Sequence, residues 1–170
     1  MMGEMAGEVV ERGSLSELYV AYAPDAIRLA FLMTGDRDLA EDLVQDAFVR
    51  LIGRLRHLRE PSAFGAYLRR TIVNLATSHF RHGRVERAYL ERTSAAPSSV
   101  ANVNYDLDET MHRVLLGLPQ RQRAAIVLRF YEDLSDVQTA AVLGCSPGTV
   151  RSLVSRGMKT LREELGGMPR

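Results

Sequence analysis

Hydroxyl and guanidinium side chains gather at the start of a predicted helix near the C-terminus, within the stretch GCSPGTVRSLVSRGMKTLREEL. Ser146 suits the N-cap position, where its hydroxyl would accept from amide groups of the first turn, and Pro147 suits the first helical position. Apolar residues recur at helical spacing and predict one buried stripe: Val150, Leu153, Val154, Met158, Leu161 and Leu165. The other side of the helix is polar and basic: Arg151, Ser152, Ser155, Arg156 and Lys159. Because arginine favours paired hydrogen bonds with phosphate and guanine, this side suits nucleic acid.

The preceding segment, LSDVQTAAVLG, predicts a shorter helix over residues 135–143, because Ser135 and Gln138 have capping-box spacing. Its small or apolar residues would let another helix approach closely: Val137, Ala140, Ala141 and Leu143. A short link through Cys145 joins the two helices, as in a helix-turn-helix motif. Short helices joined by a glycine turn also occur in ordinary bundles. Packing in an ordinary bundle would not explain why two arginines and two serines lie on the exposed first turns of the second helix. No acidic residue balances them before Glu163.

Charge is unevenly distributed along the 170 residues, although the net charge is only +1. Residues 61–100 carry a net charge of +4 and residues 121–170 a net charge of +3, and acidic segments precede each of them. This pattern predicts two anion-facing surfaces. Arginine supplies nearly all of the positive charge, a bias that a GC-rich genome would also produce.

The remaining composition excludes several classes of protein. The single cysteine, Cys145, rules out an internal disulfide and a cysteine-based metal cluster. The sequence has no long apolar run and no signal-peptide pattern, so we expect a cytoplasmic protein without membrane insertion. No Gly-rich phosphate loop or nucleophile–His–acid set is present, and we expect neither catalysis nor a cofactor.

Nearly every segment has helical periodicity, so we expect an all-α fold. The uncharged stretch TSAAPSSVANVN has linker composition. We therefore expect a disordered N-terminus (1–13), a helical domain (14–92), a flexible linker (93–105) and a second helical domain (106–166). The predicted helices cover residues 14–33, 36–55, 62–82, 84–92, 106–116, 119–132, 135–143 and 147–165.

The second predicted helix has an apolar band and an acidic opposite face made of Asp38, Glu41, Asp42, Gln45 and Asp46. Such a face is commonly only solvated surface. Here it precedes a basic segment of the same domain, so it is also suited to a basic protein partner.

The third predicted helix combines arginines with aromatic residues, a pattern suited to single-stranded nucleic acid. Phe64 and Tyr67 stand beside the loop at Pro61, and either ring could instead belong to the core. His79, His82 and Glu86 could share a helix face, but they are interleaved with arginines, and we expect no metal site.

The chain resembles the small bacterial sigma factors of the extracytoplasmic-function type. The resemblance rests on DLAEDLVQDAFVRL, on AFGAYLRRTIVNLATSHFRH and on the C-terminal stretch from LPQRQRAAIV to MKTLREEL. In that family the first segment grips the clamp helices of the RNA polymerase β′ subunit, the second reads and melts the downstream promoter box, and the third reads the upstream box. The resemblance implies a region 2-like helical bundle and a region 4-like helix-turn-helix domain.

The resemblance also implies roles for individual residues. Core polymerase would be contacted by Asp42, Gln45 and Asp46. The opened non-template strand would be handled by Phe64, Tyr67, Arg70, Asn74 and Arg81; the family usually has tryptophan where Tyr67 stands. The upstream box would be contacted by Thr149, Arg151, Ser152, Ser155, Arg156 and Lys159, with Thr149 and Lys159 on the DNA backbone.

As a member of this family, the chain would bind core RNA polymerase, through the β′ clamp and the β flap, and would direct promoter recognition, melting and transcription initiation. Promoter DNA and an anti-sigma factor are the other implied partners. Two alternatives remain open from the sequence. One is a helix-turn-helix regulator that binds duplex promoter DNA as a dimer, and the other is a helical metallo-hydrolase that uses His79 and His82.

Overall fold

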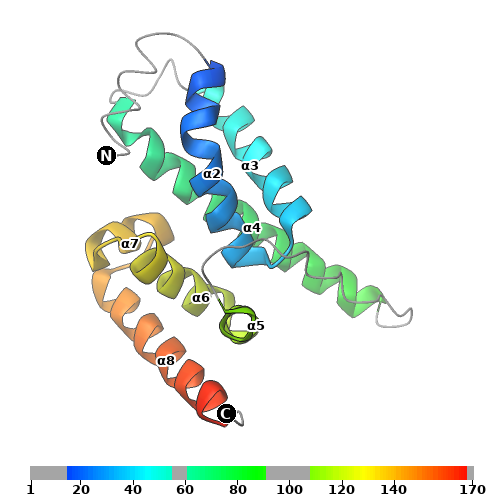
Figure 1. Cartoon of the computed structure of the whole chain (residues 1–170), viewed down its shortest axis with the longest axis vertical. Coiled ribbons are helices and arrows are strands. Elements are labelled where there is room, and N and C mark those ends of the chain that lie inside the picture. The colour runs from blue at the N-terminus through cyan, green and yellow to red at the C-terminus, as the bar shows by residue number, and fades with distance from the viewer. Residues whose placement is uncertain (1–14, 55–60, 91–107, 168–170) are drawn as a thin grey trace. The chain divides into compact units, whose positions relative to one another are not determined.

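A computed structural model describes residues 15–54, 61–90 and 108–167 (Figure 1). Every regular element in these ranges is helical, which confirms the all-α fold class. The chain divides into two compact units, Met1–Val103 and Asn104–Arg170. The predicted disordered N-terminus (1–13) and the predicted linker (93–105) lie outside the described residues.

The first unit is built from helices α2 (Leu15–Thr34), α3 (Arg37–Ile52) and α4 (Phe64–Leu90), with the short 3₁₀ turn η2 (Pro61–Ala63) before α4. Each of the three helices packs against the other two. The α2–α3 connection is short because Thr34 and Asp36 satisfy backbone groups on both sides of Gly35. The Thr34 hydroxyl donates to the Ala30 carbonyl (2.8 Å), and the Asp36 carboxylate accepts from the Leu39 N–H (3.1 Å).

An aromatic cluster fills the centre of the first unit. The Phe64 ring is completely buried and lies 5.0 Å from the ring of Tyr22 and 5.8 Å from the ring of Phe48, measured between centroids. Burial raises the pKa of the Tyr22 hydroxyl, while the nearby Arg69 acts in the opposite direction. Because α4 begins at Phe64, this ring fixes the start of the helix against α2 and α3.

The predicted interruption of the third helix near residue 83 is wrong. The helix α4 runs without a break from Phe64 to Leu90. One glycine inside a helix costs only about 1 kcal/mol relative to alanine, which a long, partly packed helix tolerates.

The second unit contains helices α5 (Glu109–Gly117), α6 (Gln120–Ile126), α7 (Asp136–Leu143) and α8 (Pro147–Gly166). The π-helical segment η3 (Val127–Tyr131) continues α6 directly, so the single helix predicted over residues 119–132 has two parts. Two residues after it, Asp133 has a positive φ of 53° and turns the chain toward α7. The last helix packs against α5, α6 and α7, with Val150 fully buried.

The buried side of α8 differs from the predicted stripe. Its buried residues are Val150, Leu153, Gly157 and Leu161. Gly157 belongs to this set because a β-carbon there would lie only 2.6 Å from Cδ1 of Ile126, so α6 and α8 approach closely at this glycine. The residues predicted as buried beside it, Val154, Met158 and Leu165, are only half-buried.

The packing face of α7 also differs from expectation. Its buried residues are Thr139, Ala140 and Val142, whereas Val137 and Ala141 are exposed. The small-residue pattern thus predicted the burial of Ala140 correctly, but it missed that Thr139 and Val142 also face inward.

Arg123 holds the C-terminal end of α5. The side chain is only 5% exposed, and it donates to the carbonyls of Leu115 (3.2 Å), Leu116 (2.6 Å) and Leu118 (3.0 Å). Burial lowers the pKa of Arg123 to about 10, which still leaves the group charged at neutral pH. A cation at a helix C-terminus is favourable because the last carbonyls lack partners within the helix.

We expect Arg123→Ala to reduce the free energy of unfolding of the second unit by about 2–3 kcal/mol, because it leaves buried carbonyls unpaired. Urea denaturation followed by circular dichroism measures this change. The matched control is Arg121→Ala, at an exposed position of the same helix, which should shift stability by no more than about 0.5 kcal/mol. Equal unfolding midpoints for the two variants would show that Arg123 has no special role.

Candidate nucleic-acid and protein interfaces

The turn between α7 and α8 has helix-turn-helix geometry with local hydrogen bonds at both ends. Gly144 ends α7 in the left-handed conformation (φ 64°), and the Cys145 N–H donates to the Ala140 carbonyl (3.1 Å). Ser146 is the N-cap of α8, accepting from the Thr149 N–H at 3.1 Å, and Pro147 occupies the first turn. The Ser146 cap, the place of Pro147 and the Ser135–Gln138 capping box at the start of α7 confirm the sequence predictions.

The side of α8 opposite the core is polar, as predicted. Its exposed residues are Arg151, Ser152, Ser155, Arg156 and Lys159. Thr149 is half-buried, and its hydroxyl lies 3.0 Å from the Ser146 hydroxyl at the N-cap. Arg156 Nε donates to the Ser152 carbonyl (3.3 Å), which leaves other guanidinium donors of Arg156 free to bind a ligand.

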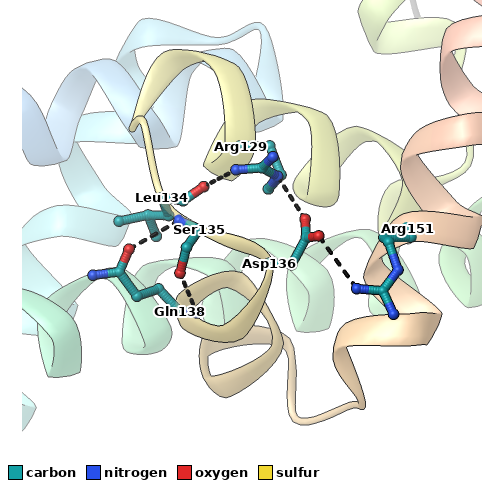
Figure 2. A network of polar contacts seen from close by, with 6 residues as sticks. All are labelled: Arg129, Leu134, Ser135, Asp136, Gln138 and Arg151. Atoms are coloured by element: carbon teal, nitrogen blue, oxygen red, sulfur yellow. Dashed lines mark hydrogen bonds and ion pairs between the residues drawn. The ribbon is translucent and has the colours of Figure 1, made fainter.

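Sequence reasoning missed an acidic partner for Arg151. The Asp136 carboxylate lies 3.5 Å from Nη1 of Arg151 and 2.8 Å from Nε of Arg129 (Figure 2). Arg129 also donates to the Leu134 carbonyl. Asp136 begins α7 and Arg151 lies in α8, so only the packing of the two helices brings them together, and local spacing carried no signal for the pair.

The predicted strand-binding residues of α4 divide into two groups. Tyr67 is 46% exposed, and Arg70, Asn74 and Arg81 are exposed as well. Their spacing places all four along one side of the helix. Phe64 does not belong to this group, because its ring lies inside the aromatic cluster and could reach a nucleotide only if the core opened. The prediction that Phe64 contacts DNA is therefore corrected to a core role.

An open cavity of about 200 Å³ lies beside the exposed α4 residues. It is lined by Arg50, Leu51, Arg54, Thr71, Asn74, Leu75 and Ser78. Leucine side chains supply an apolar surface, while hydroxyl, amide and guanidinium groups supply hydrogen bonds, a combination that suits a flat polar ligand such as a nucleobase. Asn74 was predicted from the sequence, but Arg50 at the end of α3 and Arg54 in the turn after it were not.

The acidic face of α3 is present on the surface of the first unit. Asp42 and Gln45 are exposed and Asp46 is half-buried. Asp46 pairs with Arg50 (3.0 Å), one turn later. Exposed pairs of this kind contribute little to stability, so the face can exchange them for a partner's cations.

No group of three His, Cys, Asp or Glu side chains in the described part of the chain is arranged to hold a metal ion. His79 and His82 are both exposed on α4, and the side chain of Glu86 lies outside what the structure describes. None of the described helices is long and apolar enough to span a membrane.

Comparison with known proteins gives a consistent result for both units. Residues 18–85 match the family model for Sigma-70 region 2, and residues 108–161 match the model for Sigma-70, region 4. The chain is 36% identical over 160 residues to the RNA polymerase sigma-E factor of Streptomyces coelicolor, an alignment that covers 94% of this chain and 88% of that protein.

Two further relatives extend the comparison. The ECF RNA polymerase sigma factor SigE of Mycolicibacterium smegmatis is 32% identical over 169 residues, covering 95% of this chain and 65% of that protein. The solved structure of the sigma factor RpoE from Bartonella quintana, in complex with the anti-sigma factor NepR, has a TM-score of 0.76 and 26% identity, covering 91% of this chain and 98% of that chain.

The chain therefore belongs to the extracytoplasmic-function family of RNA polymerase sigma factors, which direct promoter recognition and transcription initiation. Its two units are a region 2 and a region 4 domain, in agreement with the fold expected from the sequence. Membership in this family replaces the two alternatives, a dimeric regulator and a metallo-hydrolase.

Proposed function

We propose that the three surfaces described above divide the work of a sigma factor. The exposed side of α8 reads the upstream promoter box as duplex DNA. The exposed side of α4, with its cavity, holds the opened strand of the downstream box. The acidic face of α3 binds the β′ clamp of core RNA polymerase. The observation that carries this assignment is the polar row of Arg151, Ser152, Ser155 and Arg156 directly after a capped helix-turn-helix turn.

The assignment of α8 follows from how duplex DNA is read. A recognition helix enters the major groove with its N-terminal residues at the base edges, and arginine pairs with guanine through two hydrogen bonds. Arg151 and Arg156 carry exposed guanidinium groups on the first turns of α8, with the two serines between them. Thr149 and Lys159, at the two ends of this row, are assigned to the DNA backbone.

The assignment of α4 follows from the mixture of aromatic, amide and basic groups. Tyr67 offers a ring on which an unstacked base can pack, while Arg70 and Arg81 can follow the phosphates. The cavity at Asn74 can receive a base that has left the helical stack, which would offset part of the energy of strand opening. Arg50 and Arg54 join the proposed strand-binding set because they line the same cavity.

The assignment of α3 follows from charge. An acidic surface is repelled by DNA, so Asp42, Gln45 and Asp46 suit a protein partner with basic side chains. We include the β flap of the polymerase as a partner of the second unit, and an anti-sigma factor as a partner that competes for these surfaces. RNA synthesis itself remains with the polymerase, in the bacterial cytoplasm.

We expect Arg156→Ala to lower run-off transcription from the cognate promoter roughly tenfold, because one base contact contributes about 1–3 kcal/mol of discrimination. Binding to core polymerase in a pull-down should be unchanged. The matched control is Arg162→Ala, an exposed arginine farther along the same helix, which should retain transcription. Loss of core binding by Arg156→Ala would contradict the assignment of α8 to DNA.

Asp42→Arg should have the opposite effect to Arg156→Ala: it should weaken binding to core polymerase. It places a positive charge where a basic partner is proposed, and like charges in an interface cost several kcal/mol, so we expect at least a tenfold loss of core polymerase binding. Fluorescence titration of the labelled chain with core polymerase measures this. The control, Glu164→Arg, makes the same charge change on α8 and should bind normally. Unimpaired binding of Asp42→Arg would exclude the clamp assignment.

Tyr67 provides the test of strand capture. Stacking of a base on an aromatic ring contributes about 1–3 kcal/mol, so Tyr67→Ala should weaken holoenzyme binding to a promoter with a pre-opened downstream box by fivefold or more. Tyr67→Phe keeps the ring and should bind as the unaltered protein does. Electrophoretic mobility shifts measure both affinities. If the alanine variant binds the pre-opened promoter normally, Tyr67 does not stack on DNA.

A further inference from the structure

The carboxylate of Asp136 connects the two helices of the helix-turn-helix motif. One oxygen lies 2.8 Å from Nε of Arg129 in an ion pair, and the other lies 3.5 Å from Nη1 of Arg151 (Figure 2). Arg129 lies in η3, Asp136 begins α7 and Arg151 lies in the second turn of α8. The inference drawn from this connection rests on the proposed role of α8 in reading DNA.

The Asp136 end of this connection is fixed. Its side chain is 28% exposed and that of Arg129 is 32% exposed, so water competes with their ion pair only in part. Arg129 is also bonded to the Leu134 carbonyl, which restrains it from a second direction. The capping box of Ser135 and Gln138 sets the backbone at the start of α7, one residue before the carboxylate.

The Arg151 end is open toward solvent. Its side chain is 67% exposed, and its Nη1 lies 3.5 Å from the Asp136 carboxylate. Nη2 lies 3.9 Å from the place that a β-carbon on Gly148 would occupy, so the guanidinium leans back over the first turn of α8. The carboxylate therefore restrains one edge of the guanidinium, and its other N–H groups remain available to a ligand.

Holding Arg151 in this way has two effects on DNA binding. An arginine that is already ordered loses less conformational freedom when it meets a base edge at a fixed place. A negative charge beside it also opposes the approach of phosphates, which are the ligands of sequence-independent binding. Both effects favour a base contact over a phosphate contact by the same side chain.

We propose that Asp136 is a positioning residue that directs Arg151 toward a base edge of the upstream box and away from the phosphate backbone. Asp136 itself does not contact DNA. Its removal frees Arg151 to bind phosphate, so specificity decreases while non-specific affinity increases.

The test uses the full chain bound to core polymerase. The unaltered holoenzyme first selects its preferred sequence from promoter duplexes randomised over the upstream box. Dissociation constants are then measured for the selected duplex, for duplexes with one upstream base pair changed and for a random-sequence duplex, over a range of salt concentrations. The variants are Asp136→Asn, which keeps the shape but removes the charge, and Glu164→Gln, a control that removes a charge from the other end of α8.

We expect Asp136→Asn to reduce discrimination at one upstream base pair about five- to tenfold. On the random-sequence duplex, the slope of log affinity against log salt should steepen by about one, because Arg151 gains a phosphate contact. Glu164→Gln should change neither quantity. In an Arg151→Ala background, Asp136→Asn should have no effect on discrimination, since the residue acts through Arg151.

Three results would overturn the proposal. Unchanged discrimination in Asp136→Asn would show that the ion pair does not position Arg151. An effect that persists in the Arg151→Ala background would show that Asp136 meets DNA directly. An equal loss of affinity for selected and random duplexes would show a purely structural role. Failure of the unaltered holoenzyme to select any upstream sequence would instead refute the proposed function of α8, and the inference with it.

Discussion

The strong negative charge of DNA is the constraint on which the arrangement of this protein depends. A protein binds a polyanion where its cations are gathered and its own carboxylates are absent or neutralised. The net charge of +1 gives no hint of this, because nearly equal numbers of acidic and basic residues are separated by element. Carboxylates predominate on the outer face of α3, which also carries Arg37 and Arg50, whereas arginines predominate on the described exposed side of α4 and on the first turns of α8. Beside Arg151, the Asp136 carboxylate is shared with Arg129.

These faces act only if the helices that carry them are held firmly. In the second unit, the close contact of Gly157 with Ile126 fixes α8 against α6, and the bonds from Arg123 hold the end of α5 against α6. In the first unit, the buried ring of Phe64 fixes the start of α4, and the exposed Tyr67 follows one turn later. Residues that pack in the core and residues proposed to bind ligands thus alternate along the same helices. Neighbouring residues of one helix can therefore have a structural role and a binding role.

Sequence reasoning predicted correctly the features that depend on neighbours in the chain. The caps at Ser135 and Ser146 are set by residues three positions apart, and most helix limits follow from the same local signals.

Sequence reasoning failed where packing between helices decides the role of a residue. Phe64 was placed at the DNA although its ring completes the core, because an aromatic residue beside arginines suits either role. Gly157 was missed as a buried residue because close approach of a second helix leaves no mark in the apolar pattern. Asp136 and Arg151 belong to different helices, and only the fold brings them together. The same holds for the cavity, where Arg50 and Arg54 meet residues of α4.

The two units read one promoter together, and we expect each to bind DNA weakly until the polymerase brings both to the same DNA. The most direct test of this claim is run-off transcription with purified core polymerase and a promoter selected by the holoenzyme. The full chain should produce a transcript of defined start, and the two units added as separate polypeptides should produce much less at equal concentration. Equal transcription from the separate units, or no promoter-specific transcript from the full chain, would contradict the account.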